Sequence, residues 1–369
     1  MKVLLLATHL NVGGIGVYTA SLARYLKTEG VSVTVASSGG DLEKALQLEG
    51  IRHIKLDIKT KSEFGLKVWK ALPLLVKLIR DEGFQLVHAQ TRVAQVLAYL
   101  AGRRSRVPFV ATCHGFFQYR KFARRILPCW GERTIAISES VRKHLVEDFR
   151  LREERVTLVY NGIELAKHSS GAQAKDQDLM KSIGIKEGAM IIGTIGRLSP
   201  VKGYKFLVSA FKDVFLNKDE CQLLFVGEGP DEKHLKQQVE DLGIGGKVLF
   251  TPGGEPLDKY LALMDIFVLP SVHEGLGLAL MEAMASGRAC IATSVGGLTE
   301  LITHEKDGLL IPPKSPEALS RAILRLAEDS PLRERLAQAA REKAMKNFSI
   351  EKSVKKTIEV YKEVLGAEA

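Results

Sequence analysis

Short apolar runs alternate with helical patterns along almost the whole sequence. They cover residues 3–7, 31–36, 51–58, 86–89, 109–112, 134–137 and 156–159 in the first half, then residues 190–195, 223–226, 247–251, 266–269 and 290–293. Strands that alternate with helices in this way pair in parallel, and a parallel sheet needs helices on both of its faces. The pattern therefore predicts an α/β protein that contains two Rossmann-like domains.

The pattern also suggests where the domains begin and end. The first domain is predicted over residues 1–165 and the second over residues 179–348, with a linker of low periodicity at residues 166–178. An amphipathic helix is expected over residues 349–369. In doubly wound sheets ligands bind beyond the carboxyl ends of the strands, so two such domains that face each other are expected to form a cleft between them.

The segment 270–285, PSVHEGLGLALMEAMA, concentrates the most informative chemistry. It places Glu274 and Glu282 eight positions apart, around a Gly-x-Gly turn that opens a helix beginning near residue 278. The uncovered N–H groups of Gly275 and Gly277 at the positive end of that helix favour a diphosphate. Carboxylates beside such a turn accept hydrogen bonds from sugar hydroxyls, so this segment predicts a nucleotide-sugar site.

The spacing of Glu274 and Glu282 also argues against a hydrolase. If the whole span were helical, the two carboxylates would stand about 12 Å apart along the axis, too far for the acid and base of a glycosidase. We therefore expect the two glutamates to hold different parts of one long ligand.

Several motifs occur in the order that a known family shows. The segment around Glu274 and Glu282 resembles the Glu-x7-Glu element of retaining glycosyltransferases with two Rossmann domains (the GT-B architecture), in particular glycosyltransferase family 4, also called group 1. Further motifs similar to that family are VGGIGVY at 12–18, TCHG at 112–115, YNGI at 160–163, GRLSPVKG at 196–203 and VGEGP at 226–230. The resemblance covers nearly the whole chain, and it implies that the C-terminal helix over residues 349–369 crosses back onto the first domain.

The resemblance implies roles for individual residues. Arg197 and Lys202 would neutralise the leaving diphosphate in place of a metal ion, Glu274 would contact the donated sugar, and His114 would lie near the anomeric centre. The catalytic candidates are thus His114, Arg197, Lys202 and Glu274. Donor binding is assigned to Gly13, Gly14, Gly16, Gly196, Gly275, Leu276, Gly277, Leu278 and Glu282, with Glu282 on the ribose hydroxyls. A structural role remains the alternative for His114, because a lone histidine is often part of a core.

The net excess of positive charge is confined to the first half of the chain. Residues 1–165 hold 26 Lys and Arg against 15 Asp and Glu, whereas the remainder holds 27 against 28. Basic and aromatic residues interleave over residues 116–127, as they do in segments that bind membrane surfaces. This segment predicts either a surface for anionic lipid or a phosphorylated acceptor, or an ordinary solvated face; its basic residues are Arg120, Lys121, Arg124 and Arg125.

Other features limit the cofactors and the location. The first apolar run, residues 3–7, is much shorter than a secretory or membrane-spanning segment, which favours a cytoplasmic protein, peripheral at the inner face of the membrane if the basic segment binds lipid. The four cysteines lack Cys-x-x-Cys spacing, so no metal site is expected. No cofactor is expected. A nucleic-acid partner is not expected either, since no nucleic-acid motif accompanies the basic segment.

The function favoured by these observations is transfer of a hexose-type sugar from a nucleoside diphosphate to a lipid-linked or saccharide acceptor, such as an envelope glycolipid or polysaccharide precursor. The resemblance implies retention of configuration without a metal. Two alternatives stay open: a nucleotide-sugar 2-epimerase and a non-catalytic nucleotide-sugar-binding remnant. A nicotinamide oxidoreductase is disfavoured, because Gly13, Gly14 and Gly16 do not follow the Gly-x-Gly-x-x-Gly spacing. The base, the sugar and the oligomeric state leave no readable pattern.

Overall fold

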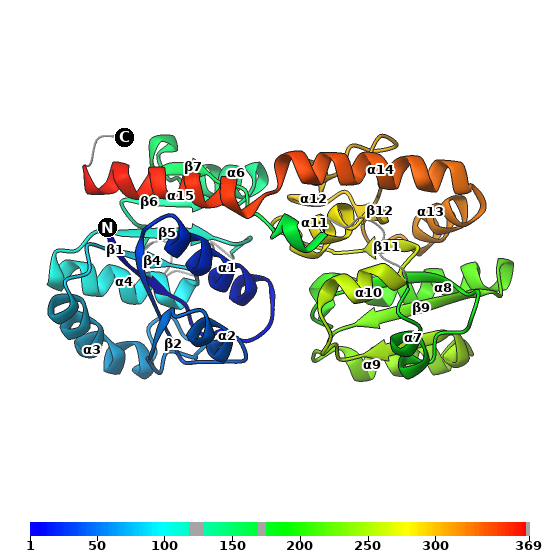
Figure 1. Cartoon of the computed structure of the whole chain (residues 1–369), viewed down its shortest axis with the longest axis horizontal. Coiled ribbons are helices and arrows are strands. Elements are labelled where there is room, and N and C mark those ends of the chain that lie inside the picture. Colours follow the sequence, from blue (N-terminus) through cyan, green and yellow to red (C-terminus); the bar gives the residue numbers. More distant parts are fainter. Residues whose placement is uncertain (118–128, 169–174, 367–369) are drawn as a thin grey trace. The chain divides into compact units, whose positions relative to one another are not determined.

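The computed structural model describes residues 1–117, 129–168 and 175–366, and the chain divides into two compact units. Unit 1 contains Met1–Gly162 together with Ile350–Ala369, and unit 2 contains Ile163–Ser349. Each unit is built on a parallel β-sheet with helices packed against it (Figure 1). The predicted α/β fold with two Rossmann-like domains is thereby confirmed.

The sheet of unit 1 has seven parallel strands in the order β3-β2-β1-β4-β5-β6-β7. The chain runs outward in one direction from β1 to β3 and in the other direction from β4 to β7, so the order switches between β1 and β4. Loops at such a switch point diverge and leave room for a ligand. The strands are β1 (Lys2–Leu6), β2 (Ser32–Ser37), β3 (Arg52–Lys55), β4 (Leu86–Ala89), β5 (Phe109–Cys113), β6 (Arg133–Ala136) and β7 (Val156–Leu158).

Helices cover both faces of this sheet (Figure 1). On one face, α3 (Leu66–Glu82) and α4 (Arg92–Ser105) pack on a core that includes Leu4 and Leu6 of β1. The alternation of side chains along a strand leaves the neighbouring residues for the opposite face, where α1 (Gly14–Thr28) packs against the C-terminal helix. Two shorter helices of the part of unit 1 that the structure describes are α2 (Glu43–Leu48) and α6 (Glu139–Glu147).

The C-terminal helix α15 (Ile350–Leu365) belongs to unit 1, although unit 2 precedes it in the chain. Its Tyr361 hydroxyl lies 2.5 Å from Nδ1 of the buried His88 on β4, and the Nε2 atom of His88 lies 2.7 Å from the hydroxyl of Thr112 on β5. Burial lowers the pKa of His88 to about 3, so the imidazole is neutral. A third contact joins Tyr18 of α1 to Ser353, with 3.1 Å between their hydroxyls. These bonds satisfy polar groups that the helix buries.

The sheet of unit 2 has six parallel strands in the order β10-β9-β8-β11-β12-β13. These are β8 (Met190–Ile195), β9 (Cys221–Val226), β10 (Val248–Thr251), β11 (Ile266–Leu269), β12 (Ala289–Thr293) and β13 (Leu309–Ile311). The order again switches direction, here between β8 and β11. The helices are α7 (Gln177–Ile183), α8 (Tyr204–Asn217), α9 (Glu232–Asp241), α10 (Leu257–Leu263), α11 (Leu278–Ala285), α12 (Leu298–Leu301), α13 (Pro316–Glu328) and α14 (Ser330–Asn347).

Some predicted boundaries were wrong. The strand predicted over residues 51–58 is only β3, because Ser38 Oγ accepts hydrogen bonds from the backbone N–H groups of Ile58 and Lys59 and turns the chain into a loop. Strand β13 was not predicted, since three residues are too few to show a period. The basic residues of the segment 116–127 lie outside the described residues; they are Arg120, Lys121, Arg124 and Arg125.

Candidate active site

In unit 2 the loop that follows β8 lies against the end of β11. Gly203, at φ +68°, is the residue that caps the start of helix α8, and a Cβ atom at this position would lie 2.1 Å from the carbonyl oxygen of Pro270. Only glycine permits that approach. The backbone N–H of Val272 also donates to the carbonyl of Val201 at 2.8 Å. The two loops are therefore fixed together at the carboxyl edge of the sheet, at its switch point.

This approach brings Lys202 and Glu274 into contact. The Lys202 Nζ atom lies 2.5 Å from Glu274 Oε2, and the Ser271 hydroxyl donates to the same oxygen at 3.0 Å. The backbone of Ser271 is held in turn by the hydroxyl of Thr293, which donates to its carbonyl at 2.6 Å. Two predicted catalytic residues, 72 positions apart, thus meet in one hydrogen-bonded cluster, which we call the Lys202 cluster (Lys202, Ser271 and Glu274).

The electrostatics of this cluster keep Lys202 charged. Burial is the largest single influence on the pKa of Lys202 and would lower it, but the Glu274 carboxylate and, to a smaller extent, Tyr204 together hold the pKa above its ordinary value. The Lys202 and Glu274 side chains are 22% and 16% exposed, so solvent reaches both groups only in part. A cation kept charged in a partly desolvated loop interacts with an anionic ligand more strongly than a cation in water.

The second glutamate lies on a helix, as the sequence predicts. Gly277 caps helix α11, and Glu282 lies inside that helix, while Glu274 precedes it in the turn. Leu276 is only 1% exposed, so its side chain belongs to the protein interior and only its backbone is left for a ligand. Leu278 is the first residue of the helix and is half-buried. The segment therefore has the predicted turn and helix.

Glu282 stands in an environment unlike that of Glu274. The residue is half-buried, and its carboxyl group makes no hydrogen bond with another of the described residues. Burial raises the pKa of Glu282 to about 8, with a smaller lowering from Lys167 and a smaller raising from Glu164. Near neutral pH this carboxyl is therefore largely protonated in the ligand-free protein, and it can donate as well as accept a hydrogen bond.

Arg197 is placed differently from Lys202. Gly196 directly follows β8, and the Arg197 side chain beyond it is exposed. Across the described parts of the chain, no carboxylate forms an ion pair with Arg197. The structure therefore leaves this guanidinium available to solvent, while it secures Lys202 against Glu274.

In unit 1 the glycine loop leads from β1 into α1. Gly13 precedes the helix, Gly14 is its first residue, and a Cβ atom at Gly16 would lie 2.2 Å from the carbonyl oxygen of Asn11. Gly16 therefore allows the loop to fold back on the start of the helix. The N–H groups of the first helical turn have no partner within a helix. Because glycines leave these groups uncovered, the start of α1 suits an anionic group.

His114 follows β5 of the same sheet. Its Nε2 atom lies 2.9 Å from Oε1 of Gln90, which follows β4 and is only 1% exposed. The Tyr18 ring packs edge-on against the imidazole, with 5.5 Å between the ring centroids. Burial lowers the pKa of His114 to about 3, so the imidazole is neutral. Because the amide oxygen of Gln90 can only accept, the proton lies on Nε2 and the Nδ1 atom is left as an acceptor.

Two residues of these sites were not predicted. Ser271 and Gln90 each bind a predicted catalytic side chain, and each follows a strand within two residues of its end. That position was the only signal in the sequence that could have found them. Among the residues that the structure describes, no group of three or more His, Cys, Asp or Glu side chains is placed to hold a metal ion.

Comparisons with known proteins bear on both units. The profile of the family described as "Glycosyltransferase Family 4" matches residues 12–167, and that of "Glycosyl transferases group 1" matches residues 175–343. The chain belongs to the group 1, family 4 glycosyltransferases. As a member of this family, the protein is a glycosyltransferase that uses a nucleotide-sugar donor.

The relatives of this glycosyltransferase are distant in sequence, but the similarity extends over most of each chain. An uncharacterized glycosyltransferase of Methanocaldococcus jannaschii is 25% identical, over 95% of this chain and 94% of its own length. The UDP-Gal:alpha-D-GlcNAc-diphosphoundecaprenol alpha-1,3-galactosyltransferase of Escherichia coli is 26% identical, over 80% of each chain. The solved structure of HepE from Anabaena, in complex with UDP and glucose, covers 98% of this chain and 99% of its own, with a TM-score of 0.86 at 23% identity. That likeness supports the fold of the glycosyltransferase.

Proposed function

We propose that this glycosyltransferase is a retaining, metal-independent hexosyltransferase whose donor is a nucleoside diphosphate hexose. The observation that carries the proposal is the Lys202 cluster, in which a partly buried cation touches a carboxylate at the carboxyl edge of the unit 2 sheet. A leaving diphosphate needs positive charge, and a transferred sugar needs hydrogen-bond acceptors for its hydroxyls. The cluster offers both within one contact.

Each side chain has a distinct role in this proposal. Lys202 and the exposed Arg197 neutralise the diphosphate, Glu274 accepts hydrogen bonds from hydroxyls of the transferred sugar, and Glu282 binds the ribose hydroxyls. The backbone N–H groups of the loop before α11 contribute further donors to the phosphates. In unit 1, the unprotonated Nδ1 atom of His114 accepts a hydrogen bond from a hydroxyl near the anomeric carbon.

The reaction has a simple balance of bonds. The bond from the anomeric carbon to the diphosphate oxygen breaks, and a bond to the acceptor oxygen forms on the same face of the sugar. The acceptor proton passes to the departing phosphate oxygen, so no protein nucleophile is required. Because charge develops on the diphosphate as the bond breaks, Lys202 and Arg197 stabilise the transition state more than the bound substrate.

The acceptor is proposed to be a lipid-linked or saccharide precursor of the cell envelope. A relative with this type of acceptor is the Escherichia coli galactosyltransferase, whose name specifies a diphosphoundecaprenol-linked sugar. The excess of basic residues in the first half of the sequence suits an anionic acceptor or membrane surface. Within the described segments no helix is long and apolar enough to cross a membrane. A cytoplasmic location, peripheral at the inner face of the membrane, is part of the proposal.

Calorimetric titration with UDP, GDP, ADP and NAD in the presence of EDTA tests the donor assignment. Binding of one nucleoside diphosphate is expected, and binding of NAD alone would overturn the assignment. The matching sugar nucleotides are then offered with saccharide acceptors, and the anomeric configuration of the product is read by proton NMR. Retained configuration supports the proposal. An inverted product, an epimerised nucleotide sugar formed without acceptor, or binding without transfer would replace it, and a requirement for added Mg²⁺ would refute metal independence.

A further inference from the structure

Helix α3 exposes several large apolar side chains. Leu66 is 78% exposed, Trp69 48% and Leu74 61%, all within nine residues of one helix. Pro73 is exposed as well, and the spacing of three, four and one residues places all four on one side of the helix. The opposite side, which includes Val68 and Leu72, packs into the core of unit 1. The exposed side is therefore an additional apolar surface, separate from the one that holds the helix in place.

Basic side chains border this surface. The exposed basic residues of α3 are Lys67, Lys70, Lys77 and Arg80. Lys67 pairs with Asp57 at 2.8 Å and Lys77 pairs with Asp81, while Lys70 has no ion pair with any of the residues described. Helix α3 has nine exposed residues, one of which is the Asp81 that pairs with Lys77. We call the other eight the α3 face: Leu66, Lys67, Trp69, Lys70, Pro73, Leu74, Lys77 and Arg80.

The positive charge continues onto the neighbouring helix. Arg80 Nη2 donates to the carbonyl of Arg104 at 2.5 Å, so the end of α3 lies beside the end of α4. The last turn of α4 contains Arg103 and Arg104, and Arg106 follows it. Between Glu82 and Glu132 the sequence contains no acidic residue. This side of unit 1 therefore presents apolar side chains flanked by a net positive charge.

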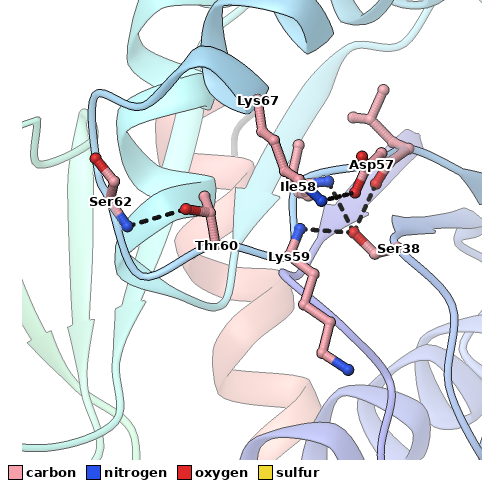
Figure 2. Close-up of polar contacts among 8 residues, drawn as sticks. Ser38, Asp57, Ile58, Lys59, Thr60, Ser62 and Lys67 are labelled. Carbon is pink, nitrogen blue, oxygen red and sulfur yellow. Dashed lines mark hydrogen bonds and ion pairs between the residues drawn. The ribbon is translucent and has the colours of Figure 1, made fainter.

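The loop before α3 fixes the start of this surface. Ser38 Oγ accepts hydrogen bonds from the backbone N–H groups of Ile58 and Lys59, both at 2.7 Å, and Lys67 reaches back to Asp57 (Figure 2). The Lys59 side chain extends away from these bonds in the same view. These contacts fix the loop that precedes α3. The apolar surface is therefore exposed without a rearrangement of that loop.

We propose that the α3 face docks unit 1 on the surface of an anionic lipid bilayer. A helix with Trp and Leu flanked by Lys and Arg suits the interface, where apolar groups enter the acyl boundary and cations meet lipid phosphates. A second copy of the chain fits this surface poorly, because a two-fold contact would bring the same lysines together. The proposal rests on the peripheral location proposed above, but it assigns that location to α3 and not to residues 116–127.

Vesicle binding tests the proposal without reference to sugar transfer. The chain has two tryptophans, Trp69 and Trp130, and a Trp130→Phe variant leaves Trp69 as the only emitter. Its fluorescence is expected to shift to the blue with vesicles of phosphatidylglycerol and phosphatidylcholine, and to stay unchanged with phosphatidylcholine alone. If Trp130→Phe does not fold, quenching of the wild-type emission by brominated phosphatidylglycerol gives the same information.

A matched pair of variants distinguishes vesicle binding through the α3 face from nonspecific hydrophobic adsorption. Replacing Leu66, Trp69 and Leu74 together by serine is expected to lower the vesicle partition coefficient roughly 100-fold, since each side chain loses its apolar burial. Replacing Leu48 and Leu216 by serine removes apolar side chains that are 87% and 70% exposed on other helices, and it is expected to leave partitioning unchanged. Transfer to a soluble acceptor should be the same in both variants, so failure of docking is distinguishable from failure of the proposed activity.

Three results would overturn the proposal. Equal binding to neutral and anionic vesicles would remove the role of the basic residues, and unchanged partitioning of the triple serine variant would remove the α3 face. Self-association that depends on concentration and disappears in the triple variant would assign the surface to a second copy. A further replacement of Lys70 and Arg80 by glutamine is expected to weaken binding at low salt more than at high salt, because salt screens these charges.

Discussion

Replacement of Lys202 by methionine tests the centre of the proposed mechanism, because it removes the ammonium group and keeps most of the apolar chain. With the side chains of Lys202 and Glu274 22% and 16% exposed, the pair lies between a surface pair and a fully buried pair. A surface pair contributes about 0–1 kcal/mol, and breaking a buried pair costs about 3–5 kcal/mol. We expect the variant to lose about 1–3 kcal/mol of unfolding free energy, measured by urea denaturation.

The expected loss in catalysis is larger than the loss in stability. Removing one preorganised donor from a developing anion commonly costs about 10²–10³ in kcat, or about 3–4 kcal/mol. Steady-state kinetics of Lys202→Met should show a fall of that size in kcat with an intact fold. A folded variant with wild-type turnover would refute the assignment of Lys202 to the diphosphate.

A second ion pair in the same unit provides the control. Lys175 Nζ lies 2.9 Å from Asp265 Oδ1, with side chains 30% and 28% exposed, and Asp265 precedes β11 at the opposite end of the sheet from Pro270. Lys175→Met is expected to lower stability by about 1 kcal/mol and to leave transfer unchanged. If it lowers kcat as much as Lys202→Met does, the loss reflects the stability of unit 2 and not the charge beside the diphosphate.

Three further predictions concern the buried polar groups. Because the pKa of Glu282 is raised to about 8, the unfolded chain ionises this carboxyl between about pH 4.5 and 8 while the folded protein keeps it protonated, and the free energy of unfolding falls over that window. Glu282→Gln escapes this loss and should gain about 1 kcal/mol per pH unit over wild type there, read by urea unfolding at several pH values. Tyr361→Phe leaves Nδ1 of His88 unpartnered and should cost about 1–3 kcal/mol in the same assay. Gln90→Leu removes the acceptor for His114, so ¹⁵N NMR should show a loss of the Nε2–H tautomer; an unchanged spectrum would contradict that role for the amide.

The periodic parts of this fold could be predicted because each strand carries its own signal. A buried parallel strand is a nearly continuous apolar run. Strand β11 is such a run followed by proline, and β8 is one that is interrupted only near its end by Gly193 and Thr194 and is followed by glycine. The turn at Glu274 and the helix around Glu282 were predicted for the same local reason, since a Gly-x-Gly turn precedes good helix formers.

The contacts between distant elements could not be predicted from local patterns. Tyr361 binds His88 across 273 residues, and nothing in either sequence neighbourhood indicates the other. The exposure of the α3 face could not be predicted from the sequence for a different reason. Apolar residues occur on every side of the sequence LKVWKALPLLVKLI, and this pattern resembles that of a helix buried all round. Only the packed structure shows that Val68 and Leu72 face the core while Trp69 and Leu74 face solvent.

Under the proposed function, the Lys202 cluster is expected to recognise sugar and diphosphate together. In the ligand-free structure Glu274 already accepts from Lys202 and Ser271, so neither charge is left unpaired in the partly buried loop. Under the proposed mechanism a diphosphate shares the Lys202 cation, which weakens the hold of Lys202 on Glu274 and frees carboxylate lone pairs for sugar hydroxyls. A nucleoside diphosphate without its sugar would leave Glu274 under-satisfied, and a free sugar would have to compete with Lys202. The pair therefore favours the intact nucleotide sugar over either of its halves.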